Sequence, residues 1–378
     1  MSTTNILSNY YLKLYLELEN ELEDFKKSKF TKIFPKLDNE NLFNWYFNQK
    51  TEDLIKYSNY LCEKLYGKIV YLRGLIEFSN ICQRDCLYCG IRKSNKNVNR
   101  YILTNEQIKN IILDGLSRGF KTFVLQSGEN DKIIPEKISN LLFEIKNIKK
   151  SHMDDFAITL SCGVYQKEVY KSWKKYGANR YLLRFETSDE KIFKNLCPGR
   201  TLDERLKALD DLKILGYEVG SGFMVGLPGE NHRTRINNIL LCHHFQFDMV
   251  GIGPFIPHSQ TPLKDEKPLL IEESIRLTAL LRIILPFSNI PATTAAGTLD
   301  PFGREKMLCS GANVLMPNIT PKERKKDYLL YDGKICINEE GYQCIGCLES
   351  RLEKINKNIS LDKGDSLSYH IRIFNYKK

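Results

Sequence analysis

Three cysteines lie close together in the stretch C-Q-R-D-C-L-Y-C, at Cys82, Cys86 and Cys89. Closely spaced thiolates are ligands for zinc or for iron–sulfur clusters. A structural zinc site needs four ligands, and the nearest other cysteines are Cys62, before the adjoining β-rich run, and Cys162, far downstream. A [4Fe-4S] cluster held by three cysteines instead leaves one iron open to a ligand from outside the protein. The spacing therefore favours an iron–sulfur site over zinc.

The spacing C-x₃-C-x₂-C, with Tyr88 directly before the last cysteine, resembles the signature of the radical S-adenosylmethionine (SAM) superfamily. The resemblance implies that the open iron binds the amino and carboxylate groups of SAM. It also implies that an electron from the cluster cleaves SAM to a 5′-deoxyadenosyl radical. A cluster without catalytic function is the alternative.

Further polar residues follow the next apolar runs in the order that a cofactor site requires. The tetrapeptide Q-S-G-E offers acceptors for a primary ammonium group. Carboxylate and guanidinium groups suit a ribose diol and a methionine carboxylate, and a thioether packs well under a flat ring. Internal salt bridges and core packing are the alternatives. The predicted cofactor-binding residues are Tyr88, Gln126, Ser127, Gly128, Glu129, Thr159, Ser161, Arg184, Glu186, Arg205 and Met224.

Eight short β-rich runs must position these side chains, and helical patterns with i, i+3, i+4 apolar spacing follow most of them. Alternating strands and helices predict a (β/α)₈ TIM barrel, in which chemistry gathers where the strands end. Arg180, Arg184 and Glu186 share a two-residue period that points all three into the barrel. The eight runs are residues 68–80, 121–129, 156–163, 180–187, 217–229, 247–258, 289–297 and 313–318.

Three segments are predicted along the chain. Residues 1–66 place apolar and charged side chains at helical spacing and form an N-terminal helical segment. Residues 67–320 form the radical SAM barrel. Residues 321–378 form a C-terminal extension with a second cysteine cluster, and its lysine-rich stretch after Ile355 is expected to be peripheral.

The composition excludes several classes of protein. Hydrophobic residues make up 42% and charged residues 27% of the 378, as in ordinary globular proteins. No apolar run is long enough to span a membrane, and the N-terminus lacks the pattern of a secretory signal. The net charge of +10 reflects scattered lysines, and eleven cysteines are an odd number for secreted disulfides. A cytoplasmic protein without nucleic-acid or membrane partners is therefore expected. We also expect a monomer.

A longer series of blocks resembles the HydE family, the radical SAM maturases of [FeFe]-hydrogenases. The similarity covers roughly residues 67–350, and the blocks occur in order. These blocks distinguish the chain from biotin synthase more clearly than from methylornithine synthase, which is the nearer relative of the two. The blocks are IEFSNIC-x₃-CLYCG, VLQSGE, RYLLRFET, GFMVGLPG, FDMVGIGPFIPH, TPL, NIPATTAAGT, GANVLMPN and GKIC.

The resemblance also implies a substrate site deeper in the barrel. Two threonine hydroxyls and a guanidinium are suited to an anion, and barrel-core packing is the alternative. The residues carried over are Arg180, Thr293, Thr294 and Tyr328, with Met224, Met316 and Ile256 lining the site.

The family resemblance further implies a substrate and partners. The substrate would be an iron complex with cysteine, carbon monoxide and cyanide made by HydG, the product would pass to HydF, and ferredoxin or flavodoxin would donate the electron. A methylornithine synthase-like rearrangement of lysine is a second hypothesis. A non-catalytic iron–sulfur scaffold or electron carrier is a third.

A second cysteine triad, Cys336, Cys344 and Cys347, lies beyond the last predicted strand. The family resemblance implies an accessory [2Fe-2S] or [4Fe-4S] cluster there, with zinc as an alternative. Since some family members lack this triad, it is expected to be dispensable for catalysis. The isolated cysteines are expected to be small buried hydrophobic residues; they are Cys62, Cys162, Cys197, Cys242 and Cys309.

Overall fold

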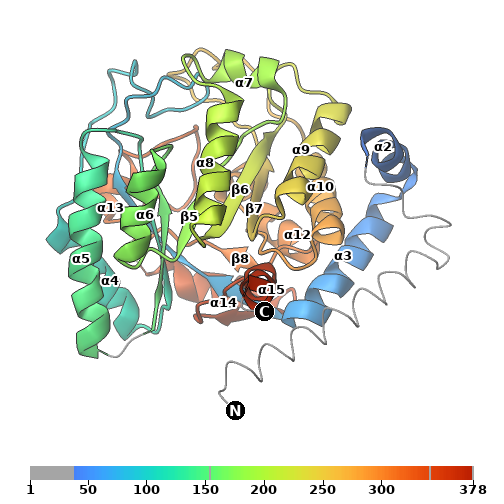
Figure 1. Ribbon diagram of the computed structural model, residues 1–378. Helices are drawn as coiled ribbons and strands as arrows, with labels where there is room; N and C mark the ends of the chain where they lie inside the picture. Colours follow the sequence, from blue (N-terminus) through green and yellow to red (C-terminus); the bar gives the residue numbers. More distant parts are fainter. Residues whose placement is uncertain (1–37, 153–154, 340–341, 377–378) are drawn as a thin grey trace.

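Parallel strands with helices around them form the body of the protein in the computed structural model (Figure 1). The structure describes residues 38–152, 155–339 and 342–376, so the helical pattern expected before residue 38 lies outside the described residues. Six strands form one continuous parallel sheet in chain order. They are β2 (Gly74–Ser79), β3 (Thr122–Ser127), β4 (Ala157–Ser161), β5 (Arg180–Leu182), β6 (Glu218–Val225) and β7 (Met249–Pro254).

Two further segments close this sheet into a ring. Residues 289–291 lie beside β7, and residues 314–318, which include the short strand β8 (Val314–Leu315), lie between them and β2. The eight β-rich runs thus form the eight parallel segments of the barrel wall, and the fold prediction is confirmed. The closing contacts are the parallel pairings of Met249 with Asn289, Pro291 with Val314, and Leu75 with Asn318.

Helices surround the barrel, as the apolar periodicity predicts. Capping boxes begin two of them: Thr104 with Gln107 before α4, and Thr201 with Glu204 before α8. The helices of the barrel region are α4 (Asn105–Ser117), α5 (Ile134–His152), α6 (Lys167–Lys175), α7 (Glu190–Leu196), α8 (Leu202–Ile214), α9 (His232–Phe245), α10 (Ile271–Ile284), α11 (Thr294–Leu299), α12 (Gly303–Cys309) and α13 (Lys322–Lys325).

Two N-terminal helices, α2 (Asn39–Asn48) and α3 (Thr51–Tyr66), lie against the outside of the barrel. Figure 1 shows them beside α9 and α10. Arg276 of α10 donates hydrogen bonds to the Thr51 hydroxyl (2.6 Å) and to the Gln49 carbonyl (2.8 Å). No helix among residues 38–152, 155–339 and 342–376 has the length and hydropathy to cross a membrane.

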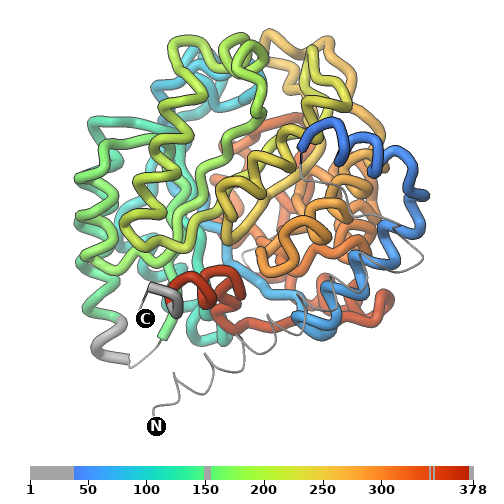
Figure 2. The backbone as a smooth tube through the Cα atoms, turned by 45° about the vertical axis from the view of Figure 1, so that its right-hand side comes forward, coloured from blue at the N-terminus to red at the C-terminus, as the bar shows by residue number. Residues whose placement is uncertain are grey.

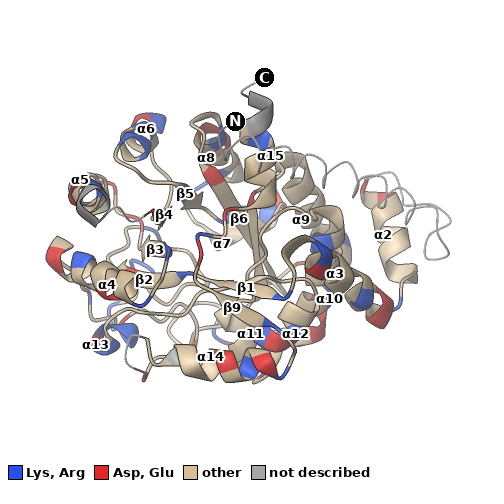
Figure 3. Cartoon of the chain, turned by 90° about the horizontal axis from the view of Figure 1, so that it is seen from below, with Lys and Arg blue, Asp and Glu red and all other residues tan. Residues whose placement is uncertain are grey.

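The C-terminal segment closes the lower end of the barrel, where the strands begin. After α14 (Cys344–Glu353), β9 (Asn358–Ser360) pairs with β1 (Ile69–Leu72), and α15 (Leu367–Tyr376) follows. Figures 2 and 3 show this segment running across the underside, with β9 beside β1. Arg73 and Asn289 each donate a 2.9 Å hydrogen bond to the Gly364 carbonyl. The expectation of a peripheral tail after Ile355 is therefore wrong, because these residues supply partners for polar groups of the barrel.

Arg180 is central to this closure. Its side chain is 2% exposed, and its Nε lies 2.5 Å from Glu218 Oε2. Its Nη2 donates to the Lys363 carbonyl at 2.8 Å and to the Asp365 carboxylate. Burial would raise the pKa of Asp365, but the charge of Arg180 and its hydrogen bond lower this pKa below the ordinary value of 3.8. The charges at the lower end of the barrel are therefore paired.

Replacing Arg180 tests the importance of this closure. Arg180→Met leaves Glu218 buried without its closest cation, and breaking a buried ion pair costs about 3–5 kcal/mol. Denaturant unfolding followed by circular dichroism is expected to show that the free energy of unfolding falls by about 3–5 kcal/mol. Lys306→Met, in the more exposed pair with Asp300 (2.5 Å), is the control and is expected to cost at most about 1 kcal/mol. Equal effects in the two variants would contradict this assignment.

Candidate active site

The loop that follows β2 carries the three cysteines to the upper end of the barrel, where the strands end. Cys82, Cys86 and Cys89 are partly buried and line one cavity. Backbone hydrogen bonds hold the loop, and one of them joins the Leu87 amide to the Leu196 carbonyl at 2.8 Å. Three thiols therefore reach the cavity from a single short loop.

The cysteine thiols differ in their electrostatic surroundings. Burial raises the pKa of Cys82 and Cys89. A side-chain hydrogen bond with Cys197 lowers the pKa of Cys86. Cys197 is 1% exposed, as expected for a small buried residue. Metals bind the thiolate form of cysteine, so metal binding at this loop must release the thiol protons. Burial favours the protonated form of Cys82 and Cys89 and therefore opposes this release.

Glu129 anchors the cysteine loop from the end of β3. Its Oε1 accepts hydrogen bonds from Arg84 Nε (2.5 Å) and Arg200 Nη2 (3.1 Å). Its Oε2 accepts from the Val164 amide at 3.0 Å. Arg84 lies between Cys82 and Cys86 in the sequence, so this network fixes the loop over the cavity. Binding of the SAM ammonium by Glu129 stays a prediction.

Gly128 allows the same loop to lie directly on the end of β3. Its amide donates to the Ser79 carbonyl at 2.8 Å. A Cβ atom at this position would lie 2.7 Å from the Ile81 carbonyl oxygen and 2.8 Å from Cys82 Cβ. Any larger residue must therefore displace the chain that carries Cys82.

The cavity below the loop has a volume of about 380 Å³, within the range of small-molecule sites. The cavity brings together residues that were predicted to bind the cofactor or the substrate, and these residues come from the segments between β2 and α11 and from the C-terminal extension. Thr293, Thr294, Met316, Tyr328 and Ile256, predicted as the substrate site, all line it. The predicted cofactor residues that line it are Tyr88, Gln126, Ser127, Gly128, Glu129, Ser161, Arg184, Glu186, Arg205 and Met224.

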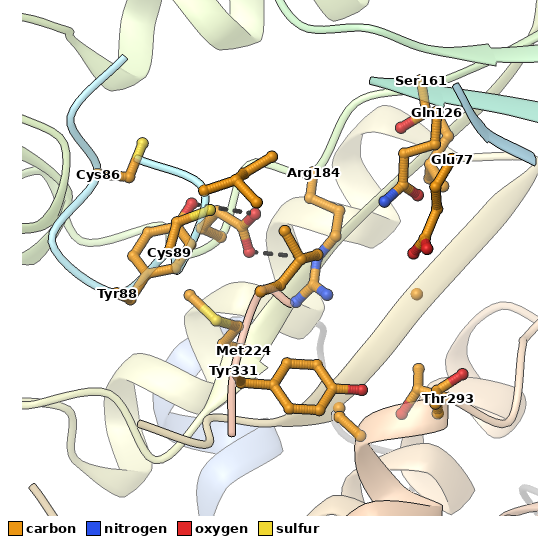
Figure 4. Close-up of a pocket in the computed structure, with 18 of the residues that line it drawn as sticks. Glu77, Cys86, Tyr88, Cys89, Gln126, Ser161, Arg184, Met224, Thr293 and Tyr331 are labelled. Carbon is orange, nitrogen blue, oxygen red and sulfur yellow. Dashed lines mark hydrogen bonds and ion pairs between the residues drawn. The ribbon is translucent and has the colours of Figure 1, made fainter. Parts of the chain in front are cut away.

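Glu186 and Arg184 project into this cavity from the end of the fourth run. Glu186 has φ of 68°, a left-handed conformation that is uncommon for this residue type and often found at functional sites. It accepts a 3.4 Å hydrogen bond from the Tyr88 hydroxyl and lies 3.2 Å from Arg184 Nε. Among the described residues, Arg184 Nη2 has no hydrogen-bond partner. Figure 4 shows its guanidinium between the cysteine loop and Gln126.

Two predicted residues lie elsewhere. Arg180 and Thr159 pair with each other across β5 and β4, and neither lines the cavity. The prediction that Arg180 belongs to the substrate site is therefore wrong. Four residues of extended chain separate Arg180 from Arg184 by about 13 Å, so Arg180 lies too deep in the barrel. Its guanidinium is instead held by Glu218 and Asp365. Thr159 is 1% exposed, one layer below the cofactor residues.

The second cysteine triad is described only in part. Cys336 is partly buried with φ of 62°, and Cys347 is exposed. Both line a smaller cavity of about 90 Å³. The side chain of Cys344 lies outside the part of the chain that the structure describes, and no group of three metal-binding side chains is found in the rest. The accessory cluster stays a prediction.

Comparison with known proteins assigns the chain to a family. Residues 76–242 match the model of the radical SAM superfamily. Over 313 residues the chain is 45% identical to the [FeFe] hydrogenase maturase subunit HydE of Thermotoga maritima, covering 83% of this chain and 88% of the relative. This chain belongs to the HydE family. It is therefore a radical SAM enzyme.

Two more distant relatives agree with this assignment. The 3-methylornithine synthase of Methanosarcina barkeri is 27% identical over 288 residues, which cover 76% of the HydE-family chain and 79% of the synthase. The crystal structure of methylornithine synthase (PylB) has a TM-score of 0.73 at 25% identity and covers 86% of this chain and 94% of that one. The electron-carrier hypothesis is not supported, because family membership makes the chain an enzyme.

HydE-family membership implies a [4Fe-4S] cluster and SAM, and the residues present fit both groups. Three thiols line one cavity from one loop, although neither they nor any other three His, Cys, Asp or Glu side chains of residues 38–152, 155–339 and 342–376 are gathered into a preformed metal site. Arg184 keeps a donor without a partner among the same residues. A guanidinium in that position suits a carboxylate. Glu186 and Tyr88 supply polar groups beside it.

Sequence reasoning missed about half of the cavity wall, including the polar residues Glu77, Tyr331 and Lys334. Glu77 carries a detectable pattern, because a charged residue at i+2 from Leu75 in an apolar strand points to the same face. Tyr331 and Lys334 lie in an irregular segment after the barrel. Since that segment has no periodicity, its direction could not be predicted.

Proposed function

We propose that this HydE-family enzyme matures [FeFe]-hydrogenase by acting with SAM on a small iron complex that carries cysteine, carbon monoxide and cyanide. The observation that carries the proposal is the 45% identity to the Thermotoga maritima maturase across most of both chains. The cavity supports it, since the residues proposed for SAM and those proposed for the substrate share one space of about 380 Å³.

The proposed roles divide the cavity into two regions. Near the loop, Cys82, Cys86 and Cys89 would hold the cluster. When bound and reduced, the cluster supplies the electron that cleaves SAM to a 5′-deoxyadenosyl radical. The Arg184 guanidinium would orient the methionine carboxylate, and the Glu186 carboxylate would accept from a ribose hydroxyl.

The inner region would hold the substrate. The hydroxyls of Thr293 and Thr294 can donate hydrogen bonds to an anionic ligand, while Met316, Ile256 and Met224 present apolar surface that excludes water. The Tyr328 hydroxyl lies 3.4 Å from Gln126 Nε2, and burial raises its pKa well above the ordinary value. Tyr328 would therefore act as a neutral hydrogen-bonding group.

The remaining features of the proposal rest on family membership. Cys336, Cys344 and Cys347 would hold an accessory [2Fe-2S] or [4Fe-4S] cluster that catalysis does not need. HydG would supply the substrate, HydF would receive the product, and ferredoxin or flavodoxin would donate electrons. The enzyme would act in the cytoplasm as a monomer.

A rearrangement of lysine like that of methylornithine synthase is less well supported, because the identity to that synthase is 27% against 45% for the maturase. The cavity has one further acidic group for a substrate ammonium, Glu77, and Lys334 already occupies it. Incubation of the reconstituted enzyme with SAM, dithionite and lysine is expected to give no 3-methylornithine. Formation of that product would favour the alternative.

Deletion of the gene in its own host tests the maturase function. Hydrogenase activity is expected to fall to background and to return with the wild-type gene but not with Cys86→Ala. Cys336→Ala is the matched control, because it alters only the accessory triad, and it is expected to restore at least about half of the activity. Full hydrogenase activity in the deletion strain would contradict the proposal.

A further inference from the structure

The outer surface around the cysteine loop has charges that the chemistry inside the cavity does not use. Cys82, Cys86 and Cys89 line the cavity from this loop, and none of the three is fully buried. A cluster bound by them would lie directly behind the loop, so the surface around the loop is the one nearest to it. The charges on that surface affect which electron donor can approach.

The segment that contains the loop, residues 82–100, is strongly basic. The Lys93 amide donates a 2.8 Å hydrogen bond to the Arg84 carbonyl, so Lys93 lies beside the middle of the loop. Arg100 Nη1 donates to the carbonyls of Asn80 and Ile91, both at 2.7 Å, and so folds the segment back to the start of the loop. The charged residues of the segment are Arg84, Asp85, Arg92, Lys93, Lys96 and Arg100.

The helix α7 adds two more lysines beside the loop. The Leu87 amide donates a 2.8 Å hydrogen bond to the Leu196 carbonyl, so the end of α7 lies against the loop. Figures 1 and 2 show both at the upper end of the molecule. Lys191 and Lys194 share one face of α7, whose one acidic residue is Glu190. The four exposed lysines of the two segments, which we call the lysine patch, are Lys93, Lys96, Lys191 and Lys194.

The lysine patch has no internal counter-charge, whereas nearby carboxylates are already paired. Asp85 lies 2.7 Å from Arg92, and Asp131 lies 3.2 Å from Arg84. No ammonium group of the patch has an ion pair or a hydrogen bond among residues 38–152, 155–339 and 342–376. The patch therefore presents a net positive charge to solvent.

We propose that the lysine patch is the docking surface for the electron donor, an acidic protein that carries one electron at a time. The proposal rests on the proposed function, since it places the donor beside the cluster that SAM cleavage requires. In each encounter one electron passes from the reduced donor, which becomes oxidised, to the cluster, which becomes reduced. Unpaired ammonium groups attract an acidic surface, and exposed charges suit the small interfaces of electron carriers.

A solvated surface without a partner is the competing explanation, because the chain has a net charge of +10 and many scattered lysines. The variant Lys93→Glu/Lys194→Glu reverses one charge on each segment of the patch. Lys171→Glu/Lys175→Glu is the matched control, because it changes the net charge equally. Its two exposed lysines lie on α6, which returns the chain to the lower end of the barrel.

Flavodoxin, an acidic flavin protein, provides a binding probe that needs no turnover. Isothermal titration calorimetry at about 50 mM salt is expected to give the patch variant a Kd at least about 10-fold above those of wild type and control. Raising the salt to about 300 mM is expected to remove most of this difference, because salt screens exposed charges. Equal Kd values for the three proteins at low salt, or no binding to wild type, would overturn the proposal.

Turnover provides the second readout. With flavodoxin hydroquinone as the donor, formation of 5′-deoxyadenosine by the patch variant is expected to fall about 10-fold or more. With excess dithionite, which needs no docking surface, the patch variant is expected to match wild type. An equal fall with both reductants would overturn the assignment. Failure of the proposed function is distinguishable, because flavodoxin would then still drive SAM cleavage while no iron complex was consumed.

Discussion

Cys86→Ala is expected to abolish reductive cleavage of SAM. The variant removes one of the three thiols that reach the cavity from a single loop, and two thiolates cannot hold a cubane in the required orientation. Anaerobically reconstituted protein with SAM and dithionite is expected to form 5′-deoxyadenosine at least about 100-fold more slowly than wild type. Iron content at the barrel site is expected to fall as well.

Cys197→Ala is the control for this result, because Cys197 contacts Cys86 by a side-chain hydrogen bond but is not predicted to bind metal. It is expected to retain the cluster and most of the activity. The double variant Cys86→Ala/Cys197→Ala shows whether the neighbouring thiol substitutes for the lost ligand. Wild-type rates of SAM cleavage in Cys86→Ala would contradict the assignment of the loop.

Gly128→Ala is expected to have the second largest effect. The added methyl group would lie 2.7 Å from the Ile81 carbonyl oxygen and 2.8 Å from Cys82 Cβ. Since backbone atoms cannot move aside as a flexible side chain can, the loop that carries Cys82 must shift. Iron bound at the loop and 5′-deoxyadenosine formation are expected to fall together, by about 10-fold or more.

Gly346→Ala is the matched control, because no atom lies within 4 Å of a Cβ atom built there. It lies on α14, beside the accessory cysteines, and is expected to leave SAM cleavage unchanged. Both variants are compared by iron analysis after anaerobic reconstitution. If Gly128→Ala bound a full cluster with the wild-type spectrum, the proposed packing of the loop on β3 would be wrong.

Local sequence patterns were sufficient for the upper part of the molecule. The eight β-rich runs correspond to the eight segments of the barrel wall. They could be predicted because the order of β-rich runs and apolar helical periodicity reflects burial directly. The cysteine loop follows its strand without a break, so its position at the end of β2 followed from the order of residues. About half of the residues of the cavity wall were predicted, some from such patterns and the inner ones from the family resemblance.

The lower end of the barrel could not be predicted. Arg180 and Arg184 share a period of two and both face inward, but the period does not specify the depth along the barrel axis. Arg180 is paired with Asp365, which lies 185 positions away in a lysine-rich tail. The same argument applies to Lys334, whose partner Glu77 is 257 positions away. Such pairings arise from tertiary contacts that leave no periodic pattern.

The interaction between SAM and the cluster tests the central claim most directly. The measurement is electron–nuclear double resonance on the reduced cluster. It uses the variant Cys336→Ala/Cys344→Ala/Cys347→Ala, because this variant removes any contribution from the accessory triad. With SAM labelled by ¹⁵N and ¹⁷O in its amino and carboxylate groups, hyperfine coupling to the cluster is expected. A cluster with four protein ligands and no coupling, or a zinc ion bound by the cysteine loop, would contradict the account.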